Sequence, residues 1–190
     1  MKNSSAFFHI FVVIVAAFAA PPQALAEIRD ATILFANNKS ELDALRSQLP
    51  LVPDVSGFRV IPSSQIVSLR TVKAAPVSSS GAAKLKSGGY IVVCFEAGAD
   101  MNVRVAFTDV DGRWHPMIPA TFVNSANVRQ GVIYCADLAF QVPEEKGEGA
   151  IWIVGAVGGE PPQPIHLPGI ANNGTAPDRI YEKTMWYRIE

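Results

Sequence analysis

The clearest pattern in the chain is a series of short apolar segments separated by turn residues. Residues 90–97, YIVVCFEA, are apolar on both faces of an extended chain, and residues 150–157, AIWIVGAV, repeat this pattern. Residues 102–110, NVRVAFTDV, alternate apolar and polar side chains, which is typical of a half-buried strand. We therefore predict strands in these three ranges, the first two in the interior of a sheet.

Further strand-like segments lie on both sides of these ranges. Residues 31–36, 57–61 and 183–190 have short β-like runs, and the alternation in residues 64–73 also favours a strand. Residues 131–142 predict one long strand or two short ones. About eight short strands with frequent turns favour a mainly β fold, namely a single antiparallel β-sandwich of the Ig-like or jelly-roll-like type.

One short N-terminal helix is predicted, over residues 38–50. Ser40 is the expected N-cap, with Asp43 three residues later, and Pro50 ends the helix. The apolar face of this helix consists of three leucines: Leu42, Leu45 and Leu49. Residues 74–89 are rich in serine, glycine, alanine and proline, and we expect them to form a flexible loop.

The N-terminus has the organisation of a secretory signal peptide. Residues 7–20 are an apolar run that is shorter than the roughly 20 residues of a membrane-spanning helix, and Ala24, Leu25 and Ala26 form a small-x-small cleavage pattern. An uncleaved membrane anchor is the alternative. We expect a signal peptide over residues 1–26, cleavage after Ala26, and a periplasmic or secreted single domain over residues 27–190. Its expected portions are a strand–helix–strand segment (27–73), the flexible loop (74–89) and the main β portion (90–190).

The charge balance narrows the possible partners. The chain has 16 Lys and Arg against 17 Asp and Glu, a formal net charge of −1, and neither sign forms a long run. A nucleic-acid partner is therefore disfavoured, because such proteins carry a basic patch or stripe. No segment after the N-terminal run is long and apolar enough to cross a bilayer, so we expect that the mature form does not span a membrane.

The chain contains two cysteines, Cys94 and Cys135, and each lies within an apolar strand-like segment. An exported chain enters an oxidising compartment, so we expect these two cysteines to form a disulfide. Two buried free thiols are the alternative. The chain has no Cys-x-x-Cys pair, which argues against a thiol redox enzyme.

The most suggestive polar group consists of Asp109, Asp111 and His115. Two carboxylates and an imidazole are metal ligands and acid–base groups, so these residues are candidates for a metal site. The Asp-x-Asp-Gly sequence is also ordinary turn chemistry, and we expect a turn here. The chain has no nucleophile elbow, phosphate-binding loop or dinucleotide fingerprint, so no catalytic residue and no cofactor is predicted.

Two further features favour binding. Residues 160–169, EPPQPIHLPG, could present an extended segment to a partner; a surface loop without a partner is the alternative. The candidate contact residues in this segment are Pro161, Pro162, Pro164 and His166. A second set of aromatic residues could line a glycan-binding surface, although aromatic residues in strands more often belong to the core. These are Trp152, Trp186, Tyr187 and Tyr134.

Residues 84–157 also contain an ordered set of strand and turn motifs. An apolar strand follows a glycine, and then come an Asp-x-Asp-Gly turn, a strand that ends in proline, a P…N…V-x-x-G stretch, a G-x-G and a final apolar strand. This order resembles a family of uncharacterised bacterial exported β-sandwich domains that are attached to caspase-like peptidases and kinases. The cysteine pair is not part of the family pattern. The resemblance implies a β-sandwich and an accessory role, and it transfers no catalytic residue.

These features together predict an exported, non-enzymatic binding or accessory protein of the bacterial cell envelope. We expect it to bind an envelope protein through surface loops 74–89 and 158–178. A small-ligand or glycan-binding module is the first alternative, and a metal-dependent hydrolase is the second.

Overall fold

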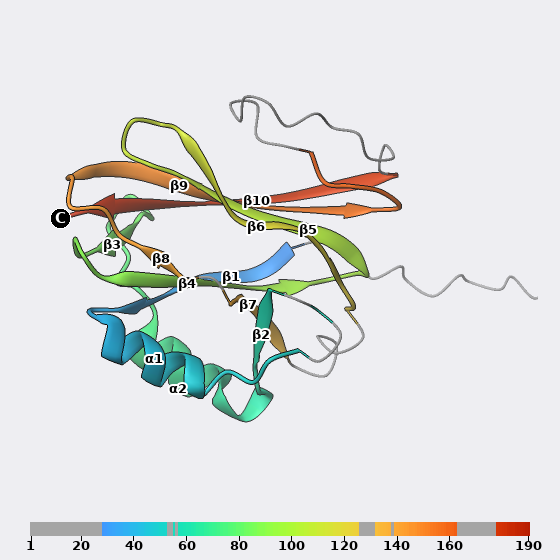
Figure 1. The fold of residues 1–190 in the computed structure, drawn as a ribbon, viewed down its shortest axis with the longest axis horizontal. Helices are drawn as coiled ribbons and strands as arrows, with labels where there is room; N and C mark the ends of the chain where they lie inside the picture. Colours follow the sequence, from blue (N-terminus) through green and yellow to red (C-terminus); the bar gives the residue numbers. More distant parts are fainter. Residues whose placement is uncertain (1–27, 53–54, 56, 126–131, 138, 163–177) are drawn as a thin grey trace, which may run out of the picture.

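The protein is mainly β, as expected. The computed structural model describes residues 28–52, 55, 57–125, 132–137, 139–162 and 178–190. Its strands form two sheets, and two α-helices are packed beneath one of them (Figure 1). The predicted signal peptide lies outside the described residues.

The first sheet has the strand order β1–β4–β7–β2, and β8 pairs with β4. All of its pairs are antiparallel. Its strands are β1 (Ile28–Ala36), β2 (Phe58–Ile61), β4 (Tyr90–Ala97), β7 (Ile133–Ala136) and β8 (Phe140–Gln141). The segment over residues 131–142 therefore contains two short strands rather than one long one.

The second sheet has the strand order β3–β10–β9–β5–β6. Its strands are β3 (Ala83–Leu85), β5 (Met101–Thr108), β6 (Trp114–Val123), β9 (Gly147–Val157) and β10 (Arg179–Ile189). Strand β3 runs parallel to β10, whereas the other pairs are antiparallel. The expectation of a purely antiparallel fold was therefore wrong for this edge.

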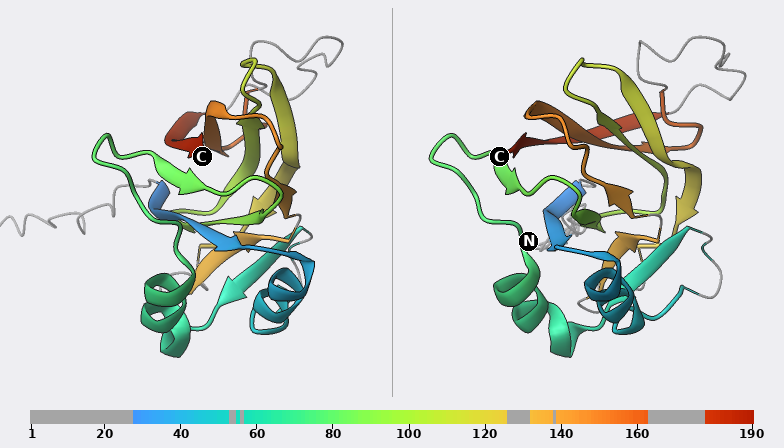
Figure 2. Two further views of the ribbon diagram at one scale, coloured as in Figure 1. Left: turned by 90° about the vertical axis from the view of Figure 1, so that its left-hand side faces the viewer. Right: turned by 60° about the vertical axis from the view of Figure 1, so that its left-hand side comes forward.

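Two apolar cores hold the layers together. The inner core lies between the two sheets, and the helix-side core lies between the first sheet and helices α1 (Lys39–Ser47) and α2 (Ile66–Lys73) (Figures 1 and 2). Strand β4 contributes Val93 and Phe95 to the inner core, and Val92 and Cys94 to the helix-side core. This double burial explains why the sequence of β4 is apolar on both faces.

Helix α1 forms within the predicted range, but its N-cap differs from the prediction. The side chain of Asn38, not Ser40, accepts a hydrogen bond from the Glu41 amide (3.0 Å), and the Glu41 carboxylate in turn accepts one from the Asn37 amide (3.1 Å). The three leucines of the apolar face are buried in the helix-side core, as predicted: Leu42, Leu45 and Leu49.

The strand predicted over residues 64–73 is wrong. A short 3₁₀ helix, η1 (Ser63–Gln65), leads into α2 instead. The β-branched residues of this segment favoured a strand, but Ile66 and Leu69 lie one helical turn apart and both pack on the helix-side core. Tertiary packing on the first sheet therefore overrides the local preference.

Two further strands differ from the sequence interpretation. Residues 83–85, within the predicted flexible loop, form β3 and pair with the last residues of β10. Strand β6, which contains Pro116 and Pro119, was expected only from the resemblance, as a strand that ends in proline. Proline cannot donate to a strand ladder, and β6 tolerates both residues because it is the edge strand of the second sheet.

The predicted disulfide between Cys94 and Cys135 is confirmed. The two cysteines lie directly opposite each other in the β4–β7 pair, and both are fully buried in the helix-side core. The bond therefore joins two neighbouring strands of the first sheet beneath the helices.

A partly buried ion-pair network fixes the end of α1 to the first sheet. The Asp137 carboxylate, which follows β7, accepts hydrogen bonds from Arg46 of α1 (2.8 Å) and from Arg59 of β2. The Arg59 guanidinium also donates to the carbonyl of Leu49 (2.8 Å), beyond the last turn of α1. Burial raises the pKa of Asp137, but the hydrogen bonds from Arg46 and Arg59 outweigh this effect, so its pKa lies below the ordinary value of 3.8.

We predict that the double substitution Cys94→Ala and Cys135→Ala lowers the free energy of unfolding by about 4 kcal/mol. The disulfide closes a loop with a sequence separation of 41, and the double variant restores the chain entropy of the unfolded state. Urea denaturation of both proteins without reductant measures the difference. Equal midpoints for the two proteins would contradict the prediction.

We predict that Asp137→Ala lowers the free energy of unfolding by about 2 kcal/mol at neutral pH, because two guanidinium groups lose their acceptor. The folded-state pKa of Asp137 is depressed, so this contribution is complete above the unfolded pKa of about 4 and is lost as the pH falls through the folded pKa. Urea denaturation at several pH values tests the prediction. The exposed ion pair of Asp43 with Lys39 provides the control, since Asp43→Ala should change stability little. A pH-independent difference would refute the assignment.

Candidate functional sites

The candidate metal residues lie at the tight turn between β5 and β6, and Asp109 closes this turn. Its Oδ1 atom accepts a hydrogen bond from the Arg113 amide (2.9 Å), and its own amide donates to the Arg113 carbonyl (2.9 Å). Gly112 has a φ of +77°, a conformation that glycine adopts without steric cost. The expected turn is therefore present, and one carboxylate oxygen of Asp109 is part of it.

The turn pairs the side chains of Asp109 and His115, whereas the carboxylate of Asp111 is directed toward Arg113, although all three residues line one pocket. His115 Nε2 lies 2.9 Å from the second carboxylate oxygen of Asp109, and the imidazole stacks on Phe107 with ring centroids 5.0 Å apart. The Asp111 carboxylate instead lies 3.9 Å from the Arg113 guanidinium in an exposed pair. The hydrogen bond from His115 is the main cause that lowers the pKa of Asp109.

An open pocket of about 360 Å³ adjoins this pair, and its walls include Phe140, Pro143 and Glu145. The exposed imidazole and its carboxylate can exchange a proton with a bound molecule. Within the part of the chain that the structure describes, no group of three or more His, Cys, Asp or Glu side chains is arranged to hold a metal ion.

The two tyrosines named as candidates for a glycan surface belong to the inner core. Tyr134 and Tyr187 are fully buried, and their hydroxyl groups donate to the carbonyls of Asn124 and Thr108. Burial is the main cause that raises the pKa of each tyrosine to about 12. Neither side chain is available to a ligand.

The tryptophans, in contrast, lie on the outer face of the second sheet. The strand register places Trp152 of β9, Trp186 of β10 and Trp114 of β6 on this side, away from the inner core. We call these three residues the tryptophan face. The rings of Trp114 and Trp152 are in contact, with centroids 5.9 Å apart, and Trp186 is 61% exposed.

The proline-rich candidate segment is only partly described. Pro161 is buried and Pro162 is half-buried, whereas Pro164 and His166 lie outside the described residues. The residue before the segment is held against the second sheet, because the side-chain amide of Asn102 donates to the carbonyl of Gly159 (2.9 Å). The described prolines are thus less accessible than the sequence suggested.

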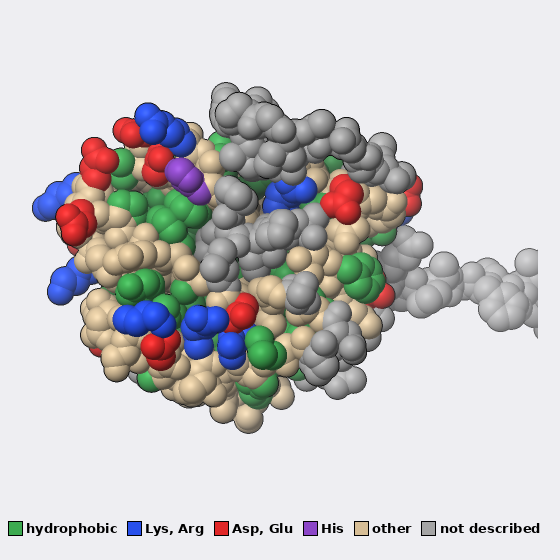
Figure 3. All heavy atoms as spheres, viewed as in Figure 1, with side chains coloured by type: hydrophobic (Ala, Val, Ile, Leu, Met, Phe, Trp, Pro, Cys, Tyr) green, Lys and Arg blue, Asp and Glu red, His purple; other side chains and the backbone are tan. Residues whose placement is uncertain are grey.

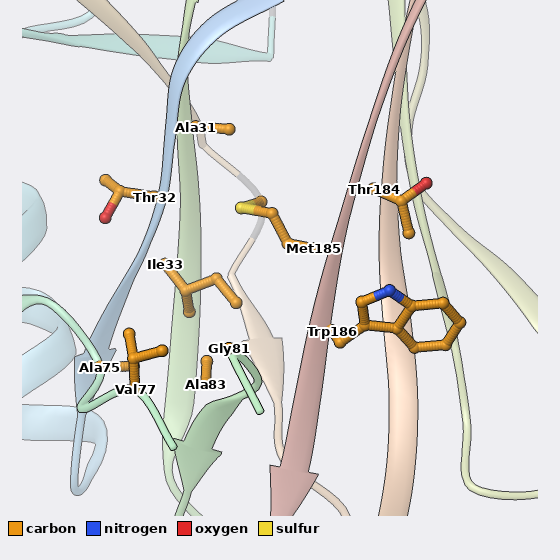
Figure 4. A pocket seen from close by; sticks show the side chains of 10 residues that line it. All are labelled: Ala31, Thr32, Ile33, Ala75, Val77, Gly81, Ala83, Thr184, Met185 and Trp186. Atoms are coloured by element: carbon orange, nitrogen blue, oxygen red, sulfur yellow. The ribbon is translucent and has the colours of Figure 1, made fainter. Parts of the chain in front are cut away.

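A groove lies between the edge strands of the two sheets, on the flank where β1 faces β10. We call it the edge groove. Its volume is about 220 Å³, and β1, the segment before β3, β3 itself and β10 line it (Figure 4). Figure 4 shows Met185 pointing from β10 toward Ile33 of β1, whereas Trp186 points to the opposite side of β10. At the rim of the groove, Val77 is 65% exposed.

Sequence reasoning did not find the edge groove. Its residues come from three segments far apart along the chain, and most of them are small or aliphatic: Ala31, Ile33, Ala75, Val77, Gly81, Ala83 and Met185. The one local signal was the position of Trp186, because a large apolar residue on the polar face of an alternating strand is unusual.

The face of the molecule viewed in Figure 3 has side chains of mixed character. Figure 3 shows acidic and basic side chains close together on the viewed face, with apolar side chains exposed between them. Among the described residues, no helix is long and apolar enough to cross a membrane. Comparison of the chain with protein-family models, with curated proteins and with solved structures found no match.

We predict that His115→Ala raises the pKa of Asp109 toward its ordinary value of 3.8, because the variant loses the main hydrogen bond that stabilises the carboxylate. An NMR titration of the Asp109 carboxyl carbon measures the shift. Arg113→Ala is a suitable control, because it keeps the amide that donates to Asp109. An unchanged Asp109 pKa in the His115 variant would show that the pair does not form in solution.

Proposed function

We propose that this chain is a non-enzymatic binding or accessory protein of the bacterial cell envelope, and that it binds an envelope protein through the edge groove. In this proposal, residues 1–26 are removed on export and the mature protein is periplasmic or secreted. One observation carries the proposal: a concave, mostly apolar groove opens between β1 and β10, with the apolar side chain of Val77 exposed at its rim.

The chemistry of the groove fits a protein partner. Contiguous apolar surface beside the exposed Val77 is costly in water and is typical of interaction sites. The groove also involves residues 75–83, which belong to the loop that the sequence analysis favoured as a contact region. The disulfide is compatible with an oxidising compartment.

We further propose that the two sheets form a sandwich of the Ig-like or jelly-roll-like type; the resemblance of residues 84–157 implies a β-sandwich. An accessory role in the envelope agrees with the same resemblance. The metal-dependent hydrolase is not favoured, because Asp109 already closes a turn and Asp111 faces Arg113.

A glycan-binding module is the second candidate, and the tryptophan face supports it. Aromatic rings on the outer face of a sheet present apolar surface to the faces of sugar rings. Of the three, Trp186 is exposed, and Trp114 and Trp152 are half-buried. In this case the ligand would lie on the outer face of the second sheet rather than in the edge groove.

We predict that a photo-crosslinking amino acid at position 77 joins the protein to one envelope protein in producing cells, and that the same group at position 51 does not. Leu51 is 58% exposed and lies outside the groove, so it is a matched control for exposure. The purified partner should then bind about tenfold more weakly to Val77→Ser, because the complex would bury this exposed apolar side chain and the variant loses that contact.

The two candidate functions predict different patterns of variants. Protein binding at the groove should be sensitive to Val77→Ser and insensitive to Trp152→Ala. Glycan binding, measured on a glycan array and by tryptophan fluorescence, should show the reverse. Crosslinking of equal yield at positions 77 and 51 would refute the groove as the binding site.

A further inference from the structure

Strand β10 forms one wall of the edge groove, and part of its main chain on that side is unpaired. The amide of Glu190 donates to the Leu85 carbonyl of β3 (3.0 Å), so the main-chain groups of Glu190 point away from β9. The direction of these groups alternates along a strand, so the even-numbered residues of β10 all point them away from β9. The pairing with β9 leads to the same conclusion. Ala150 of β9 lies opposite Trp186, and the Ala150 amide points away from β10, toward Thr108 Oγ1 (2.8 Å). Opposite residues of an antiparallel pair either bond each other or both point away, so the main-chain groups of Trp186 also point away from β9.

Strand β3 occupies only the last part of this edge. It pairs with Tyr187, Arg188 and Ile189, and before it the chain turns away at Ser78–Gly81. Gly81 has a φ of +86° in this turn. In the described part of the chain, no strand pairs with the remainder of the edge, where Ile180, Glu182 and Thr184 direct both their amides and their carbonyls outward. Trp186 directs its amide outward, whereas its carbonyl lies in the ladder with β3.

The side chains of β10 on the inner side of the second sheet have a distinct chemistry. The strand register places Met185 and Lys183 on the inner side of the sheet, opposite the inner-core residues Ile151 and Ile153. Met185 is half-buried in the groove, and Lys183 is exposed beside it. The inner side therefore offers an apolar contact next to a positive charge.

We propose that the edge groove binds an extended segment of the envelope partner, which adds to the second sheet as a strand beside residues 180–186 of β10. The segment carries apolar side chains opposite Tyr181 and Met185 and an acidic side chain opposite Lys183. Main-chain hydrogen bonds to the open edge provide the affinity, and the alternating side chains provide the specificity. This inference rests on the proposed function and names the chemistry of its partner.

A second copy of this chain is a poor occupant, for reasons of charge. Two β10 strands paired antiparallel about the middle of this edge would place Glu182 opposite Glu182, or Lys183 opposite Lys183. Like charges directly opposite each other destabilise a strand pair. An inward-facing charge on an edge strand is also a known device against self-association. The charges of the edge therefore favour a different chain.

The test uses the peptide N-acetyl-Thr-Val-Thr-Asp-Thr-Val-Thr-amide and the full mature protein. Its sequence reads the same in both directions, so that parallel and antiparallel pairing both place aspartate opposite Lys183. We expect it to slow amide hydrogen exchange at the four outward-facing residues of β10, as measured by NMR. A peptide with lysine in place of aspartate should bind about fivefold more weakly, and Lys183→Glu should reverse this preference.

Two controls distinguish strand pairing from apolar association. A peptide that is N-methylated at every residue keeps the side chains but lacks the pairing amides in either direction, and it should not bind. Thr184→Pro removes an outward amide and should weaken binding at least about tenfold, whereas Thr184→Val should not; a thermal melt establishes that both variants fold. Proline is tolerated here because this amide does not pair with β9.

Three outcomes would overturn the inference: equal binding of the N-methylated peptide, equal binding to Thr184→Pro, or no amide protection at millimolar peptide. If crosslinking at position 77 persists in these cases, the proposed function stands and the partner occupies the groove in another conformation. If that crosslinking also fails, both proposals are wrong.

Discussion

The structure depends on the pairing of β4 with its two neighbours. This strand lies between β1 and β7, is apolar on both faces and contributes side chains to both cores. The disulfide fixes β4 to β7 at the point where the helices cover the first sheet. Only residues 98–100 separate β4 from β5, so the same strand also determines where the second sheet begins. A defect in β4 would therefore disturb the helices, both sheets and the inner core together.

This arrangement leaves the two sheets with different surroundings. Helices α1 and α2 cover one face of the first sheet, and the network around Asp137 holds α1 in place (Figure 2). The outer face of the second sheet carries the tryptophan face, and its hairpin carries the Asp109–His115 pair. The candidate binding chemistry is therefore concentrated on the second sheet and its edges, because burial beneath the helices leaves the first sheet little free surface.

The edge groove exists because β3 is short. A longer β3 would pair along all of β10 and close the flank, but the turn at Ser78–Gly81 diverts the chain. Open edges invite non-specific pairing, and this flank limits it by two means. Lys183 places a charge on the inner side of β10, and β1 contains a bulge where Asp30 has a φ of +47°. The residues of β10 that line the groove, 184–186, carry no charge.

The sequence by itself determined the mainly β character, the strands over residues 90–97 and 150–157, and the cysteine pair. These features depend on local periodicity and on the chemistry of a few residues, which the sequence shows directly. It also indicated the Asp-x-Asp-Gly turn, since a turn is a local structure. Only the tertiary structure decided that residues 66–73 form a helix, that β3 runs parallel to β10, and that the tyrosines are buried while Trp186 is exposed. Packing against distant residues selected these conformations against local preference. The edge groove likewise depends on strand order, because its walls come from segments that become neighbours only when the two sheets pack together.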